Sequence, residues 1–254
     1  MNLPNRHIQN LLDCLTRSRL SFALYRLPWT DECYFVLQQS GDVEQLADIR
    51  ELNKKKGFVM APFLQSDHHP LIVIRPDITA YDWDEISEAI SSLECADALL
   101  TCKNQTEKLS PFVSEETDKE RYTQAFERFI TPLQKKHFQK LVLSRSSTKH
   151  INDDFSPLAA FVRACNNYPR MMIYLCHTPV SGTWVGSTPE ILLSGHGKEW
   201  HTVALAGTMP MQNEVMPMDW DKKNQDEQGY VADYIRRIIK KFGNKMNEKG
   251  PYTA

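Results

Sequence analysis

Between residues 21 and 76 the chain contains several short apolar runs in succession, with no helical pattern between them. Runs of this length, rich in β-branched and aromatic residues, are typical of β-strands. Strands that follow one another without an intervening helix pair in antiparallel fashion, because a parallel connection needs a long crossover. Helical patterns occur elsewhere, so we expect an α+β fold with antiparallel sheets rather than alternating βαβ units. The four runs are SFALYRL, CYFVLQQ, GFVMAPFL and LIVIRP.

Helices are predicted where apolar residues recur at helical spacing. One such pattern begins at Ile8, and another begins at Trp83. Thr117 and Glu120 match a capping box ahead of a third helix, which extends to Leu133. Ser156 followed by Pro157 is typical of a helix start. The last helix is expected from about Asp226 to Phe242, and strands are predicted for KLVLSRSSTKHI, MMIYLCH, TWVGSTPEILLSG and EWHTVALAGT.

The composition excludes several classes of protein. The chain has 41% hydrophobic and 24% charged residues, which is ordinary for a globular protein. The net charge of −2 gives no general attraction to nucleic acid or to an acidic membrane. No apolar run approaches the roughly 18 residues of a membrane helix, and the N-terminus lacks the pattern of a signal peptide. We therefore expect a small-molecule partner rather than nucleic acid or membrane; the oligomeric state stays open, with a monomer as the expectation.

Six cysteines are scattered along the chain without a CxxC pair, several of them among apolar neighbours. Scattered cysteines in apolar surroundings are typical of reduced thiols in a cytoplasmic protein. The sequence therefore predicts a cytoplasmic location. The cysteines are Cys14, Cys33, Cys95, Cys102, Cys165 and Cys176.

Three polar residues stand in otherwise apolar segments, and each has an ordinary interpretation. Lys140 opens the run KLVLSR, where a lysine protects a strand edge. Glu190 interrupts GSTPEILL; it is either a solvated strand-edge residue or a carboxylate aimed by the rigid backbone of Pro189. Glu227 begins the last helix, where the helix dipole favours a carboxylate. Between them, ALAGT ends in a turn whose N–H groups suit an anionic ligand.

Taken together, these segments resemble the chorismate-utilising enzymes, and most closely the isochorismate synthases. The resemblance lies in KLVLSR, GSTPEILL, ALAGT and KKNQDEQ, and it spans roughly residues 115 to 254. It implies a fold of large antiparallel β-sheets packed together with helices outside. On this resemblance, residues 1–114 form an N-terminal α/β subdomain, and residues 115–254 form the first portion of the chorismate-binding catalytic domain. The polar stretch 103–119 is the predicted boundary.

The resemblance also implies a reaction and a set of roles. Water attacks C2 of chorismate, the double bonds shift, and the C4 hydroxyl departs. Lys140 is the implied base and Glu190 the implied general acid, while the turn residues Gly207 and Thr208 contact the substrate. Glu227 is the implied ligand of Mg²⁺. Burial among apolar groups would shift the pKa of a lysine down and that of a glutamate up, which suits both roles.

Two positions separate the branches of the family. Lys140 is typical of the water-adding branch, and Ala206 stands where aminodeoxychorismate synthases carry a nucleophilic lysine. Salicylate synthase shares both features and then eliminates pyruvate, so it stays an alternative, as do other chorismate-utilising enzymes. A third interpretation is a non-catalytic cytoplasmic α+β binding protein. The sequence does not separate a role in menaquinone synthesis from one in siderophore synthesis.

The chain ends at PYTA, just after a turn signal. The family has a further C-terminal part that supplies a second metal carboxylate and basic groups for the substrate. We therefore expect the fold to be incomplete here through C-terminal truncation, and we expect the 254-residue chain alone to be inactive.

Overall fold

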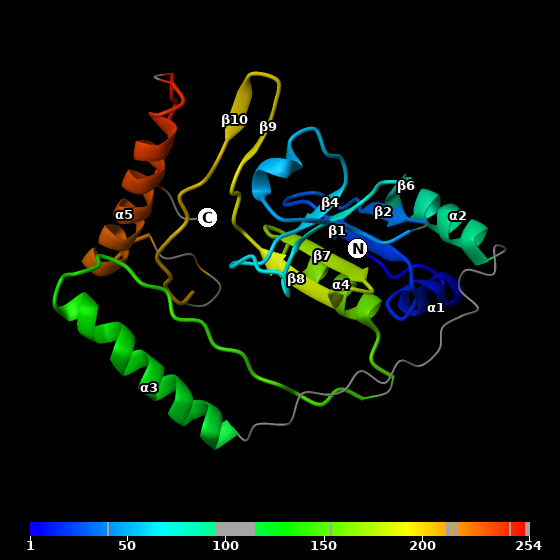
Figure 1. Ribbon diagram of the computed structural model, residues 1–254, viewed down its shortest axis with the longest axis horizontal. Helices are drawn as coiled ribbons and strands as arrows, with labels where there is room; N and C mark the ends of the chain where they lie inside the picture. The colour runs from blue at the N-terminus through cyan, green and yellow to red at the C-terminus, as the bar shows by residue number, and fades with distance from the viewer. Residues whose placement is uncertain are drawn as a thin grey trace. The chain divides into compact units, whose positions relative to one another are not determined.

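A computed structural model describes the chain in two compact units (Figure 1). The first unit comprises Met1–Lys108 and Ile151–Pro189, and the second comprises Leu109–His150 and Glu190–Ala254. The predicted boundary near residue 114 falls among residues that are not described, and the division into 1–114 and 115–254 stays a prediction. Residues Ile151–Pro189, however, pack with the N-terminal residues as part of the first unit. The described residues are 1–39, 41–94, 115–152, 154–211, 215, 218–243 and 245–251.

The first unit is built on a five-stranded sheet with the order β6-β2-β1-β7-β8. Every neighbouring pair is antiparallel, which confirms the predicted sheet type. Residues 151–189 supply β7 and β8, so two segments far apart in sequence form one sheet. The strands are β1 (Ser21–Arg26), β2 (Tyr34–Gln38), β6 (Ile78–Tyr81), β7 (Met172–Thr178) and β8 (Gly182–Thr188).

Three helices cover one face of this sheet and form the main core with it (Figure 1). Alternate strand residues point to this face, as the period of two in a strand requires. Phe22, Phe35 and Ile173 are among these residues, and all are almost fully buried. The helices α1 and α4 start at local caps, since Asn5 and Ser156 accept hydrogen bonds from backbone N–H groups three residues later. The helices are α1 (Arg6–Leu15), α2 (Asp82–Glu94) and α4 (Pro157–Asn167).

A second, three-stranded sheet packs on the opposite face, so the first unit has three layers. Ala23, Val36 and Cys176 of the large sheet contact Ile72 and Ile74 of the small sheet. The small sheet is antiparallel with the order β3-β5-β4. Its strands are β3 (Glu44–Leu46), β4 (Phe58–Met60) and β5 (Leu71–Ile74), and a short 3-10 helix, η1 (Ile49–Leu52), follows β3.

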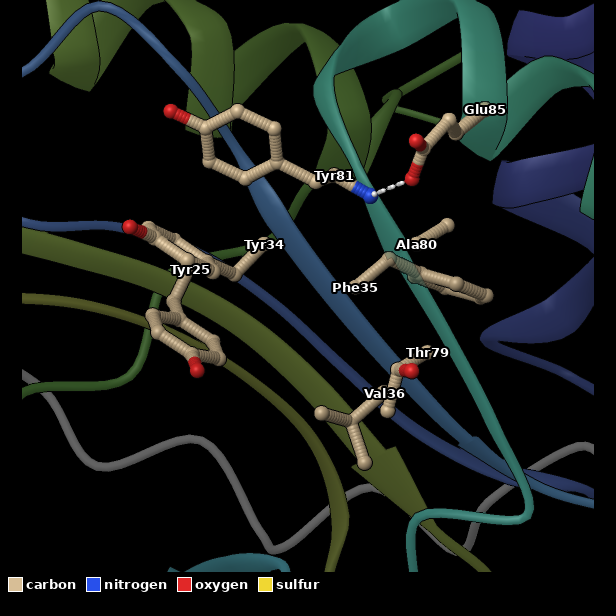
Figure 2. Close-up of a pocket in the computed structure, with 8 residues that line it drawn as sticks. All are labelled: Tyr25, Tyr34, Phe35, Val36, Thr79, Ala80, Tyr81 and Glu85. Carbon is tan, nitrogen blue, oxygen red and sulfur yellow. Dashed lines mark hydrogen bonds between the residues drawn. The ribbon is translucent and has the colours of Figure 1, made fainter.

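A row of tyrosines crosses the large sheet on the face of the small sheet. Tyr81, Tyr34, Tyr25 and Tyr174 are paired in register on neighbouring strands, and Gly186 of β8 follows in the same row. Figure 2 shows the first three side chains on the same side of the sheet. The rings of Tyr25 and Tyr34 are stacked with centroids 5.2 Å apart, and those of Tyr34 and Tyr81 meet edge to face at 5.0 Å. The ring of Tyr174 occupies the space that a side chain at position 186 would fill.

Replacing Gly186 with alanine is therefore expected to destabilise the first unit. The new Cβ would overlap the ring of Tyr174, and such overpacking costs about 1–3 kcal/mol. Thermal unfolding should show a lowered midpoint. In a Tyr174→Leu background the same change should cost much less, because the overlapping ring is gone. An equal loss in both backgrounds would contradict this account.

The described part of the second unit contains two helices and a small hairpin. Both helices were predicted, and both begin earlier than expected. Helix α3 starts before Thr117, so the predicted cap lies within the helix, and its side chain is outside the described residues. Helix α5 is capped by Asp221, whose side chain accepts the N–H of Asn224. The elements are α3 (Glu115–Gln134), β9 (Ser194–His196), β10 (Glu199–His201) and α5 (Lys222–Ile239).

Three predicted strands are absent or shorter than expected. Residues 140–151 form no strand, β8 ends at Thr188, and only the first three residues of EWHTVALAGT form β10. A strand exists through hydrogen bonds to a neighbour, and no described segment pairs with residues 140–151. Apolar side chains in these segments are consequently exposed, for example Val142 at 76% and Leu192 at 90%.

The four described cysteines form no disulfide, in agreement with the predicted reduced thiols. Cys33, Cys165 and Cys176 are buried and Cys14 is half-buried. Burial raises the pKa of the Cys33 and Cys176 thiols to about 12, so both are inert at neutral pH. The two remaining cysteines, Cys95 and Cys102, lie outside the described residues. None of the described helices has the length and apolar character needed to cross a membrane.

Candidate functional site

Lys140 and Glu227 lie in contact within the second unit. The Lys140 ammonium donates a hydrogen bond to Oε1 of Glu227 at 2.8 Å. Lys140 comes from the extended segment after α3, whereas Glu227 lies in the second turn of α5. Their side chains are 31% and 32% exposed, so the pair is half-buried rather than dry. Two residues with predicted roles, 87 positions apart, therefore meet at one place.

The Glu227 carboxylate is surrounded by groups that favour its charged form. The hydrogen bond from Lys140 holds the pKa of Glu227 below its ordinary value of 4.5, against a smaller opposing effect of burial. The charges of Lys140 and Lys223 and a hydrogen bond from the backbone of Gly207 act in the same direction. The Lys223 ammonium lies 3.9 Å from Oε2 of Glu227. The Glu227 side chain is therefore an ionised carboxylate at neutral pH, the form in which its oxygens can bind a metal ion.

The ALAGT turn lies against the first turn of α5. Gly207 has a φ of +85°, a left-handed conformation that glycine adopts without strain. A Cβ at this position would come within 3.2 Å of the backbone oxygen of Asn224, so the approach of the turn is close. The Thr208 N–H donates to Oδ1 of Asn224 at 3.1 Å. The structure thus brings Gly207 and Thr208 to the same helix that carries Glu227.

Asn224 is a residue of this site that the sequence analysis missed. Its side chain is buried, and its Nδ2 donates to Oδ2 of Asp221 at 3.1 Å. Asp221 in turn accepts the backbone N–H of Asn224 at 2.8 Å. The spacing of Asp221 and Asn224 is that of a helix cap and the residue it binds, which was the available signal.

Glu190 is placed differently from the other predicted residues. It lies in the loop between β8 and β9, and its side chain is exposed. The hydrogen bonds that join Lys140, Gly207 and Thr208 to α5 do not include it. The expectation that apolar groups surround Glu190 is wrong here, because no described strand pairs with this loop to cover it. The catalytic role of Glu190 stays a prediction.

A pocket of about 250 Å³ lies in the first unit, at the edge of the tyrosine row (Figure 2). Its lining includes Tyr25, Tyr34, Tyr81 and Glu85. The Glu85 carboxylate accepts a hydrogen bond from the backbone N–H of Tyr81 at 2.8 Å. Desolvation is the main cause that raises the pKa of Tyr25 and Tyr81. The predicted site residues are not part of this lining, so the pocket does not provide the expected acid and base.

The contact between Lys140 and Glu227 has a predictable pH dependence. Because the folded-state pKa of Glu227 is lowered, the contact stabilises the fold at pH values above 4.5 and is lost as the pH falls through the lowered pKa. The carboxyl carbon shift of Glu227 in an NMR titration should report a midpoint below 4.5. In a Lys140→Met variant the midpoint should rise toward the ordinary value, and an unchanged midpoint would contradict the assignment.

The residues present fit a magnesium site of a minimal kind. Mg²⁺ prefers hard oxygen ligands and takes only one or two carboxylates from a protein, the remainder coming from substrate and water. Glu227 offers one such carboxylate. Among the described residues, His, Cys, Asp and Glu side chains do not gather in groups of three that could hold a metal by themselves. A metal at Glu227 would compete with Lys140 for the same carboxylate.

Comparison with known proteins identifies the family of the chain. A family model described as chorismate binding enzyme matches residues 49–251. The comparison with curated proteins produced no significant match. The matched range contains Lys140, Gly207, Thr208 and Glu227, which the structure groups together, and also Glu190. Because the match covers well over half of the 254 residues, the chain belongs to the chorismate-binding enzyme family.

Proposed function

We propose that this protein is an isochorismate synthase, which converts chorismate to isochorismate with Mg²⁺ as cofactor. One observation carries the proposal: the hydrogen bond between Lys140 and Glu227, which joins the predicted base to the helix on which the ALAGT turn rests. Four of the five residues with predicted roles thereby share one part of the second unit. Family membership supports chorismate as the substrate.

In the proposed reaction Lys140 accepts a proton from the water that attacks C2 of chorismate. The ring double bonds shift, and the C4 hydroxyl leaves as water with a proton donated by Glu190. One water enters and one leaves, so the conversion is an isomerisation. Lys140 donates to Glu227 in the present geometry. As a base it acts in its neutral form, whose lone pair accepts the proton while an N–H still donates to Glu227.

The remaining residues bind and orient the substrate in this proposal. Gly207 and Thr208 present a turn that a ligand can approach closely, because Gly207 carries no side chain. Glu227 would hold Mg²⁺, which supplies positive charge to bind a carboxylate of chorismate. Substrate binding to the metal and the turn would fix the ring relative to Lys140.

The product formed from chorismate tests the proposal. The complete protein, incubated with chorismate and Mg²⁺, is expected to yield isochorismate, separable by chromatography. Salicylate together with pyruvate would identify the alternative, a salicylate synthase, which the Lys140 and Ala206 pattern also permits. Binding of chorismate without turnover would favour the non-catalytic interpretation, and formation of anthranilate from chorismate and ammonia would contradict the assignment to the water-adding branch.

We also propose a cytoplasmic location, with a role in menaquinone or siderophore synthesis. Support for the location comes from the cysteines, since the four described ones form no disulfide. Support for the role is chemical, because both pathways consume isochorismate.

A further inference from the structure

We propose that Asn224 is a positioning residue that holds the ALAGT turn on α5 and so orients the substrate-binding turn relative to Glu227. We call the hydrogen bonds that Asn224 makes to Thr208 and Asp221 the clamp. The effect of the clamp on catalysis rests on the proposed function, whereas the clamp itself can be tested separately. Asn224 is 6% exposed. Among the described residues of the second unit no other side chain is buried, so the best-protected point of this unit is a polar group.

The hydrogen bonds of Asn224 join the turn to the helix cap. Oδ1 accepts the Thr208 N–H at 3.1 Å, and Nδ2 donates to Asp221 at 3.1 Å. Thus the carboxamide uses its acceptor on the turn and its donor on the cap. A buried amide must be satisfied in this way, because an unpaired polar group carries a large desolvation penalty. One turn further along α5, Gln228 makes a longer contact of 3.4 Å with the backbone oxygen of Ala204, at the other end of ALAGT.

Asn224 and the predicted metal ligand, Glu227, accept hydrogen bonds from consecutive backbone amides of the turn. Asn224 and Glu227 are three residues apart on α5 and so lie on the same face of the helix. Asn224 binds the N–H of Thr208, and Glu227 is hydrogen-bonded by the backbone of Gly207. Without Asn224 the Thr208 end of the turn would lose its hydrogen bond to this face. Gly207, at a φ of +85°, would then be free to change the direction of the chain.

An exchange of the two polar side chains provides a sharp test. In Asn224→Asp two carboxylates face each other at positions 221 and 224, and the donor to Asp221 is lost. In the double variant Asp221→Asn with Asn224→Asp, the amide and the carboxylate have changed places and the formal charge equals that of the wild type. Asparagine at position 221 remains a good helix cap. The carboxylate introduced at position 224 still accepts the Thr208 N–H.

Two readouts are needed, hydrogen exchange of the Thr208 amide and steady-state kinetics with chorismate. Asn224→Asp and Asn224→Ala are expected to raise the KM for chorismate about tenfold or more, the factor that corresponds to one lost hydrogen bond in binding. Asn224→Ala should also remove the exchange protection of Thr208 while the middle of α5 stays protected. The exchanged double variant should recover both values to within about threefold.

The outcomes separate the clamp from the proposed function. If the wild type does not turn over chorismate, the proposed function fails. The clamp is then tested by hydrogen exchange of the Thr208 amide alone. If the wild type is active but Asn224→Ala leaves KM and Thr208 protection unchanged, the clamp is wrong. Equal loss of protection along all of α5, with no recovery in the double variant, would show that Asn224 only stabilises the helix, and would also overturn the proposal.

Discussion

A Lys140→Met variant of the complete protein is expected to lose isochorismate formation by about 10²- to 10⁴-fold, the usual contribution of a general base. Methionine keeps much of the length and the apolar stem of lysine but cannot accept the proton from water. The fold should persist, since half-exposed ion pairs stabilise proteins by no more than about 1 kcal/mol. The loss should appear mainly in kcat, measured as isochorismate formed per enzyme, with circular dichroism to verify the fold.

Lys223→Met is a matched control. Lys223 also approaches the Glu227 carboxylate, at 3.9 Å, but its side chain is 83% exposed and it has no proposed role in proton transfer. Removing it deletes the same charge near the same carboxylate, so the rate should fall by less than about threefold. Similar losses in the two variants would mean that Lys140 acts only through its charge, and a Lys140→Met enzyme with near wild-type kcat would exclude it as the base.

The elements that could be predicted from sequence are those determined by local pattern or by partners in the same unit. Helix α4 follows from Ser156 and Pro157 at its start and from apolar residues at helical spacing. Strands β1, β2 and β7 formed where expected because they pair with one another in the first unit. The short strand β3 was missed because it contains polar residues such as Glu44 and Gln45.

The failures have a common physical cause, which is that strand formation depends on distant partners. The runs beginning at Lys140 and Thr202 have the composition of strands, yet no described segment pairs with them in register. The same dependence exposes Glu190. Sequence can identify a residue type suited to a strand or a cleft, but the neighbour that covers it is set by the whole fold.

The site shows the same division. The roles of Lys140 and Glu227 followed from a resemblance, and their spacing alone gave no indication that they meet. The cap spacing between Asp221 and Asn224 indicates only a backbone hydrogen bond. The role of the Asn224 side chain depends on Thr208, which lies 16 positions earlier in the chain. Buried polar residues that connect separate segments are recognised only when both segments are placed.

Replacing Arg26 with methionine is expected to have the largest effect on the stability of the first unit. Arg26 is 2% exposed, and its guanidinium donates to five backbone carbonyl oxygens. The change would remove this donor from all five oxygens. Those of Leu27, Tyr168 and Pro169 also accept a backbone N–H, so the oxygens of Thr30 and Met171 are the ones left unsatisfied, at about 1–3 kcal/mol each. We expect a loss of about 3–5 kcal/mol, or failure to fold, since two oxygens lose their donor and three more lose a second one at the same time. The acceptors are Leu27, Thr30, Tyr168, Pro169 and Met171.

These acceptors explain why the effect should extend beyond one strand. Leu27 and Thr30 belong to the connection after β1, whereas Tyr168, Pro169 and Met171 connect α4 to β7. Arg26 therefore joins the two sequence segments of which the first unit is composed.

Chemical denaturation of three variants would test this assignment. Arg26→Lys should be intermediate, because an ammonium offers three donors where the guanidinium uses its planar fork to reach five acceptors. Arg50→Met is the matched control: its side chain is 87% exposed and pairs with a surface carboxylate, so its loss should change the free energy of unfolding by less than about 1 kcal/mol. If Arg26→Met were no less stable than Arg50→Met, the carbonyl oxygens would have to find other donors, and the connection between the two segments would rest on packing alone.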